Sequence, residues 1–167
     1  QVNNDWEALL AGDPLPFGFH QPIIDRLSRK QDPEHLRKMY ERAVDTLLDK
    51  GAGETALEII DYFLMLDEKH EWLRGRALKA IELVYTEVAG SRLEDYIGQA
   101  GLFNEDIPLK KSLQKFQDLL GATKGQVFIH RSWGLGVVRE LDLEGGRVII
   151  DFELKKNQPM TLDGVRN

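Results

Sequence analysis

The chain has 167 residues, of which 42% are hydrophobic and 30% charged, as in a globular protein with one domain or two small ones. It contains no cysteine, which excludes disulfides and thiolate metal sites, and no apolar run approaches the ~20 residues of a membrane-spanning helix. The net charge of the chain is −6, and residues 1–120 hold 15 basic and 22 acidic residues, a balance of −7, which argues against non-specific binding of nucleic-acid phosphates.

Amphipathic helices are predicted along most of the first 120 residues. The clearest covers residues 34–49, where apolar residues recur at the i, i+3, i+4 and i+7 spacing after Asp32 as N-cap and Pro33 at the first helical position. The first 30 residues are less regular, because prolines and a glycine interrupt residues 13–22. The short connections favour an antiparallel arrangement of neighbouring helices, as in an array of helical hairpins. The other predicted helices lie around Ile24 and at 54–66, 71–88, 92–99 and 108–120.

Near Gly125 the apolar pattern changes from a helical period to alternation, which predicts short β-strands. A glycine-containing hairpin turn is expected at 143–146, and such short, bent strands close most economically as an SH3-like barrel. The predicted fold is therefore α+β, with an α-helical domain at 1–121 and a small antiparallel SH3/Tudor-like β barrel at 125–167. The predicted strands are 126–130, 136–142, 147–153 and 159–162.

The segment His130-Arg-Ser-Trp-Gly-Leu-Gly-Val-Val is the most specific one in the chain. Gly134 and Gly136 allow a positive φ or a tight bend where a side chain would clash. One interpretation is a loop that presents Arg131 and Trp133 to a partner, because Arg and Trp are enriched at binding hot spots. The other is that Trp133 fills one end of a very small barrel core.

No catalytic constellation is visible, so we expect no enzyme activity, no cofactor and no metal site. His130 is interpreted as a buried or capping histidine, because nothing near it in sequence completes a proton-transfer or ligand set. Asp151 and Glu153 alternate with apolar residues, as on a solvated strand face. The basic residues of the β region could form a rim that touches phosphates, and they are Arg139, Arg147, Lys155 and Lys156. The near-zero charge of that region makes nucleic acid at most a weak partner.

The pattern Gly125-X-Val-X-Ile-His-X-X-Trp-Gly-X-Gly-Val-Val, followed by an Ile-Asp-Phe strand, resembles Tudor-like modules of bacterial transcription and repair proteins. These are the modules of CarD-type regulators, the transcription-repair coupling factor and UvrD-type helicases. Over the whole chain, the sequence is similar to the N-terminal extension of unusually large Gre-type transcript-cleavage factors. The chain begins at Gln1, without a methionine, and ends directly after a strand-like run, so we interpret it as part of a longer protein.

The resemblance implies a cytoplasmic, bacterial transcription elongation factor whose Tudor-like module docks on the β subunit of RNA polymerase, often by strand-edge contacts. We predict that Arg131, Trp133 and Arg139 contact this partner. The acidic coiled-coil tip of Gre factors has no counterpart in this sequence, so the resemblance does not imply transcript cleavage here. Two alternatives stay open: a nucleic-acid-binding accessory domain of a helicase or repair enzyme, and a helical scaffold for protein assembly.

Overall fold

The structure is a computed structural model that describes residues 2–29, 32–66, 71–122, 124–143 and 145–161. The chain divides into two compact units, Gln1–Ser91 and Arg92–Asn167. The predicted domain limits, 1–121 and 125–167, stay a prediction. Within the described residues, no helix is both long and apolar enough to cross a membrane.

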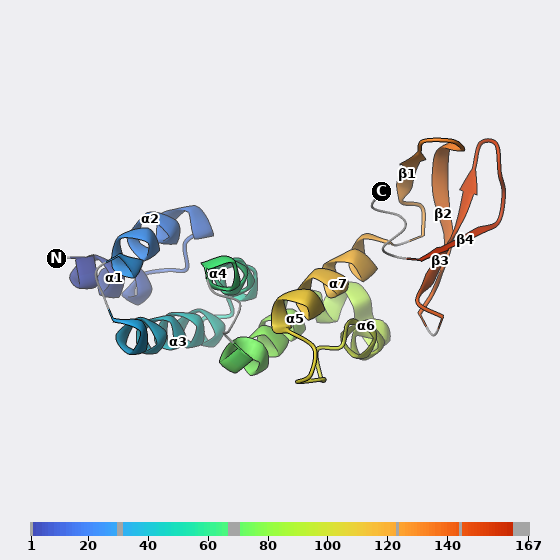
Figure 1. Cartoon of the computed structure of the whole chain (residues 1–167). Helices are drawn as coiled ribbons and strands as arrows, with labels where there is room; N and C mark the ends of the chain where they lie inside the picture. The colour runs from blue at the N-terminus through green and yellow to red at the C-terminus, as the bar shows by residue number, and fades with distance from the viewer. Residues whose placement is uncertain (1, 30–31, 67–70, 123, 144, 162–167) are drawn as a thin grey trace. The chain divides into compact units, whose positions relative to one another are not determined.

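The first unit is helical (Figure 1). Its elements are α1 (Val2–Ala11), α2 (Phe17–Ser28), α3 (Pro33–Asp49), α4 (Gly53–Leu66), the 3-10 turn η1 (Glu71–Leu73) and α5 (Arg74–Ala89). A second 3-10 turn, η2 (Gly90–Arg92), follows α5. The connection between the predicted helices at 54–66 and 71–88, where the charged residues 67–69 are expected to make a turn, lies outside the described residues.

The core of this unit forms where the apolar stripes of α3, α4 and α5 meet. Ile59, Ile60 and Phe63 of α4 are fully buried, as are Ala77 and Ile81 of α5. The N-cap prediction for α3 is confirmed: the Asp32 carboxylate accepts hydrogen bonds from the backbone N–H groups of the second and third helical residues, at 3.1 and 3.0 Å. These bonds hold the pKa of that carboxyl below its usual value. The sequence pattern therefore specified both the buried face and the start of α3.

The prediction for the first 30 residues was wrong in one respect. Helix α2 begins at Phe17 and runs through Pro22, which the sequence analysis placed in an interrupted segment, and α1 lies before it. Proline inside a helix removes one backbone hydrogen bond and crowds the preceding turn. Ile24 and Leu27 of α2 are almost completely buried, and their burial compensates for that cost.

The second unit consists of two helices followed by a sheet. Helices α6 (Leu93–Ala100) and α7 (Leu109–Gly121) precede β1 (Val127–His130), β2 (Gly134–Asp142), β3 (Arg147–Phe152) and β4 (Gln158–Thr161). The strands pair antiparallel in the order β1-β2-β3-β4, with a register shift between Val138 and Glu140 of β2.

The α+β class is confirmed, with helices first and an antiparallel sheet after them (Figure 1). The apolar positions of one sheet face are buried: Val138, Val148, Ile150 and Phe152. The four described strands form an open sheet, in which β1 and β4 are the edges. The predicted strand at 159–162 is found at Gln158–Thr161, and Leu162 lies outside the described residues.

Candidate interaction site on the C-terminal sheet

The two glycines of the Gly134-Leu-Gly136 segment have different structural roles. Gly134 has φ +74°, a left-handed conformation that other residues adopt only with strain. A Cβ on Gly136 would lie 2.4 Å from Phe152 Cδ1 and 2.7 Å from Ile150 Cγ2. Gly134 therefore shapes the turn after β1, whereas Gly136 lets β2 pack closely on the buried side chains of β3.

Trp133 is half-buried and belongs to a small aromatic cluster at the β1–β2 turn. Its ring stacks on His130 with centroids 4.1 Å apart and an interplanar angle of 15°. It also meets the edge of the buried Phe152 ring at 5.4 Å, and Lys155 Nζ lies 4.5 Å from its centroid. Trp133 therefore packs on the sheet core and keeps part of its surface in solvent, so both interpretations of this residue retain support.

The structure brings Arg131 and Trp133 into one turn and places Arg139 elsewhere. Arg131 is exposed between β1 and β2. Arg139 lies at the register shift of β2, five residues after Gly134, which corresponds to about 16 Å of extended strand. Its Nη1 donates to Asn157 Oδ1 at 3.3 Å. A single partner that contacts all three predicted residues would have to extend along β2.

Four apolar side chains, which we call the β1–β2 apolar face, lie in solvent on one side of the hairpin. They are Val127, Ile129, Leu135 and Val137, with exposed fractions of 54, 83, 46 and 43%. Val127 pairs with Val137 and Ile129 with Leu135, so all four project from the same sheet face. The sequence analysis missed this surface. Its signal was Val127-Phe128-Ile129, which is apolar at successive positions and hence on both faces of the strand.

The backbone of β1 borders this face at one edge of the described sheet. Among the described strands β1 pairs only with β2, so half of its N–H and C=O groups point away from the sheet. The carbonyl of Leu135 accepts from Glu153 N at 2.9 Å and so points toward β3. Ile129, which pairs with Leu135, therefore directs its own N–H and C=O outward. Ile129 combines outward backbone groups with a side chain that is 83% exposed.

The polar residues considered for chemistry hold turns in this structure. His130 Nδ1 accepts from Ser132 N at 3.2 Å, which places the ring proton of a neutral imidazole on Nε2 and makes His130 a turn-capping residue. Asp151 Oδ1 accepts from Asn157 N at 2.7 Å in the turn before β4. Within the described ranges, no group of three His, Asp or Glu side chains could hold a metal ion.

Comparison with known proteins gives one relative with a specific function. The chain is 26% identical over 162 residues to a Borreliella burgdorferi protein named transcription elongation factor GreA. The alignment covers 97% of this chain but only 18% of that relative, so the similarity extends through both units and leaves most of the relative unmatched. No known family model matches the chain, and no solved structure matches it.

Proposed function

We propose that this chain is a non-catalytic, RNA polymerase-binding region of a bacterial transcription elongation factor of the Gre type. The observation that carries the proposal is the similarity along 97% of the chain to a protein named as a transcription elongation factor. Such a factor works on RNA polymerase, and docking on the polymerase is the contribution that we propose for this region. We further propose that the sheet is related to the Tudor-like modules of the CarD and UvrD types and closes as an SH3-like barrel. This relationship accounts for the glycine, histidine and tryptophan pattern in residues 125–138.

The β1 edge is the proposed docking site, and the β subunit of the polymerase is the proposed partner. A strand of the partner added beside β1 would pair with the outward N–H and C=O groups of Val127 and Ile129. The β1–β2 apolar face lies next to that edge and supplies apolar area that is unfavourable in water. Arg131 and Trp133 stand at one end of the edge, and Arg139 lies further along β2, as a contact that orients the partner.

Binding of the chain to immobilised, purified bacterial core polymerase tests this proposal. Ile129→Lys should weaken binding about ten-fold or more, because burying an isoleucine contributes about 1.5–3 kcal/mol and 1.4 kcal/mol corresponds to a factor of ten. Leu154→Lys is the matched control, since Leu154 is 78% exposed, against 83% for Ile129, and lies outside the β1–β2 apolar face. Charge reversals at Arg131 and Arg139 should slow association and weaken its dependence on salt, because they remove electrostatic attraction to the partner.

The proposal fails if the wild-type chain does not bind polymerase, or if Ile129→Lys and Leu154→Lys weaken binding equally. Trp133→Ala is a poor test, because loss of contacts with His130 and Phe152 would also destabilise the sheet.

A further inference from the structure

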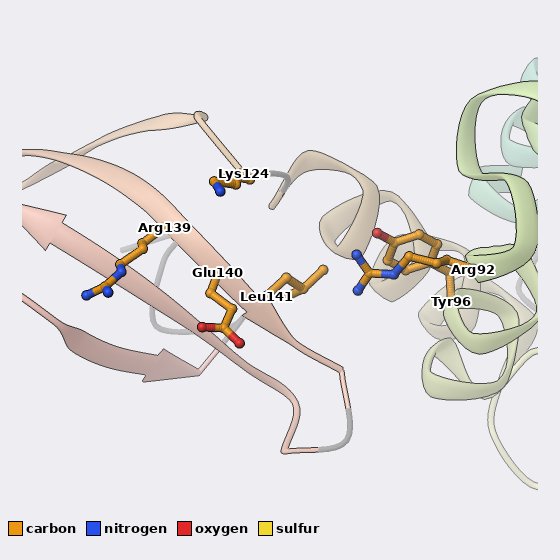
Figure 2. Close-up of a pocket in the computed structure, with 6 residues that line it drawn as sticks. All are labelled: Arg92, Tyr96, Lys124, Arg139, Glu140 and Leu141. Atoms are coloured by element: carbon orange, nitrogen blue, oxygen red, sulfur yellow. The ribbon is translucent and has the colours of Figure 1, made fainter.

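A second surface feature of the C-terminal unit is separate from the β1 edge. An open pocket of about 480 Å³ lies between α6 and β2, lined by Arg92, Tyr96, Lys124, Arg139, Glu140 and Leu141 (Figure 2). These residues come from the end of η2, from α6, from the segment before β1 and from the C-terminal half of β2, and all belong to the unit Arg92–Asn167. The volume is that of a small-ligand pocket, large enough for one nucleotide and too small for a duplex.

Positive charge is concentrated in this pocket. Three of its six lining side chains are basic and one is acidic, which leaves two net positive charges at neutral pH. The unit as a whole is neutral, because residues 92–167 contain 11 basic and 11 acidic residues. The pocket is therefore a local positive site on an otherwise balanced unit and an acidic chain, and it favours an anionic ligand.

The basic groups are distributed along the pocket. At one end the Arg92 guanidinium lies 5.5 Å from the ring centroid of the buried Tyr96, and it faces Leu141 (Figure 2). At the other end the Arg139 side chain points away from α6, and its guanidinium donates a hydrogen bond to Asn157. Cations spread along a pocket match successive phosphates of a polymer better than the single phosphate group of a small metabolite.

We propose that this pocket binds the sugar–phosphate backbone of single-stranded nucleic acid. Arg92 has a planar guanidinium group that can bind phosphate oxygens in bidentate fashion, Lys124 adds a second cation, and Arg139 stands at the far end beside Asn157. Glu140 lowers the positive potential, so binding is weak, and it falls as salt rises because each phosphate contact releases counterions. This activity does not rest on polymerase docking: the pocket shares Arg139 with the proposed docking site, whereas Arg92 and Lys124 belong to the pocket alone.

Fluorescence anisotropy of a labelled oligothymidylate, titrated with the full chain at several salt concentrations, tests the proposal. The double variant Arg92→Gln/Lys124→Gln removes two pocket charges and spares Arg139. The matched control is Lys111→Gln/Lys115→Gln, which makes the same charge change at exposed positions of α7 that do not line the pocket. The pocket variant should bind roughly ten-fold more weakly, and the slope of log K against log salt should fall by about 1.4, or 0.7 for each lost phosphate contact.

Three results would overturn the proposal. The first is no detectable binding of the oligonucleotide by the wild-type chain at low salt. The second is equal loss in the pocket variant and in the α7 control, since that would reflect net charge alone. The third is displacement of the oligonucleotide by ATP at the same phosphate concentration, which would assign the pocket to a free nucleotide. Polymerase binding by the pocket variant is measured in parallel. If the variant still binds polymerase, a change in oligonucleotide binding concerns the pocket and not the proposed docking function.

Discussion

Replacing Gly136 by alanine is expected to destabilise the C-terminal sheet by about 2 kcal/mol, within the 1–3 kcal/mol that overpacking costs. The new Cβ would lie 2.4 and 2.5 Å from two Phe152 ring carbons, about 1 Å short of a favourable carbon–carbon contact. It would also lie 2.7 Å from Ile150 Cγ2. Both neighbours are buried and belong to an aromatic ring and a β-branched side chain, so neither can turn away freely.

The size of the effect follows from two opposing terms. Displacing Phe152 also disturbs its edge contacts with Trp133 and His130, both at 5.4 Å, so the overpacking cost is expected near the upper limit of ~3 kcal/mol. Alanine restricts the unfolded chain more than glycine does, which returns about 0.5–1 kcal/mol. The matched control is Gly75→Ala, because a Cβ there has no neighbour within 4 Å and the residue lies inside helix α5. That control should stabilise the helical unit by about 0.5–1 kcal/mol.

Amide hydrogen exchange of residues 127–152 reports the free energy of opening of the sheet by itself, and exchange in α5 reports the control. Phe152→Leu makes room for the new methyl group, so the double variant Gly136→Ala/Phe152→Leu should be less destabilised than the sum of its parts by roughly 1 kcal/mol. A Gly136→Ala sheet within 0.5 kcal/mol of wild type, or strict additivity with Phe152→Leu, would refute the close-packing role of Gly136.

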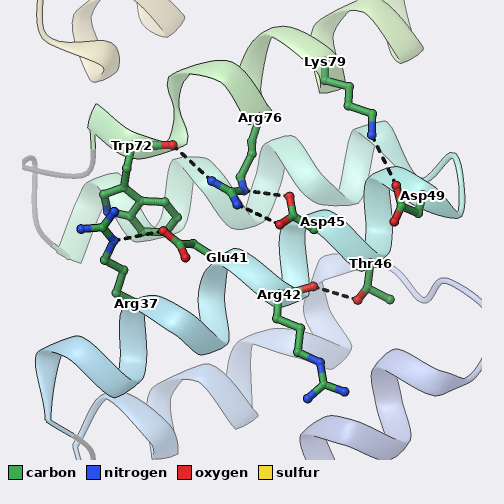
Figure 3. Close-up of polar contacts among 9 residues, drawn as sticks. All are labelled: Arg37, Glu41, Arg42, Asp45, Thr46, Asp49, Trp72, Arg76 and Lys79. Carbon is green, nitrogen blue, oxygen red and sulfur yellow. Dashed lines mark hydrogen bonds and ion pairs between the residues drawn. The ribbon is translucent and has the colours of Figure 1, made fainter.

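Two further predictions concern the helical unit. Burial lowers the pKa of His20 below 6.5, so in this pH range the folded state binds fewer protons than the unfolded state. The free energy of unfolding should therefore fall as the solution is acidified from pH 7 to about pH 5. Urea titrations of His20→Gln should show a flatter dependence of that free energy on pH. The Arg76 guanidinium binds the Asp45 carboxylate through two contacts of 2.8 Å, whereas Lys79 and Asp49 approach only to 3.4 Å (Figure 3). Double-mutant cycles should give a coupling free energy of about 0.5–1 kcal/mol for the first pair and near zero for the second. A larger coupling for Lys79 and Asp49 would contradict this expectation.

Local patterns in the sequence determined much of the secondary structure. The helix at 34–49 was predictable because its apolar spacing and the Asp32 cap act within a few turns of chain. The strands after Gly125 were predictable because alternation and glycine turns are also local. The same logic failed at Pro22, where burial of α2 side chains in the first unit outweighs the local cost of a proline.

Only the tertiary structure decided which surfaces are available for binding. Alternation shows that Val127 and Ile129 share a face, but it does not show whether another element covers that face. The pocket depends even more on folding, because Arg92 and Arg139 are 47 positions apart in the sequence and line one pocket only when α6 and β2 belong to one folded unit. Sequence periodicity encodes the direction of each side chain from its own backbone, whereas exposure and clustering of charge depend on contacts between distant segments.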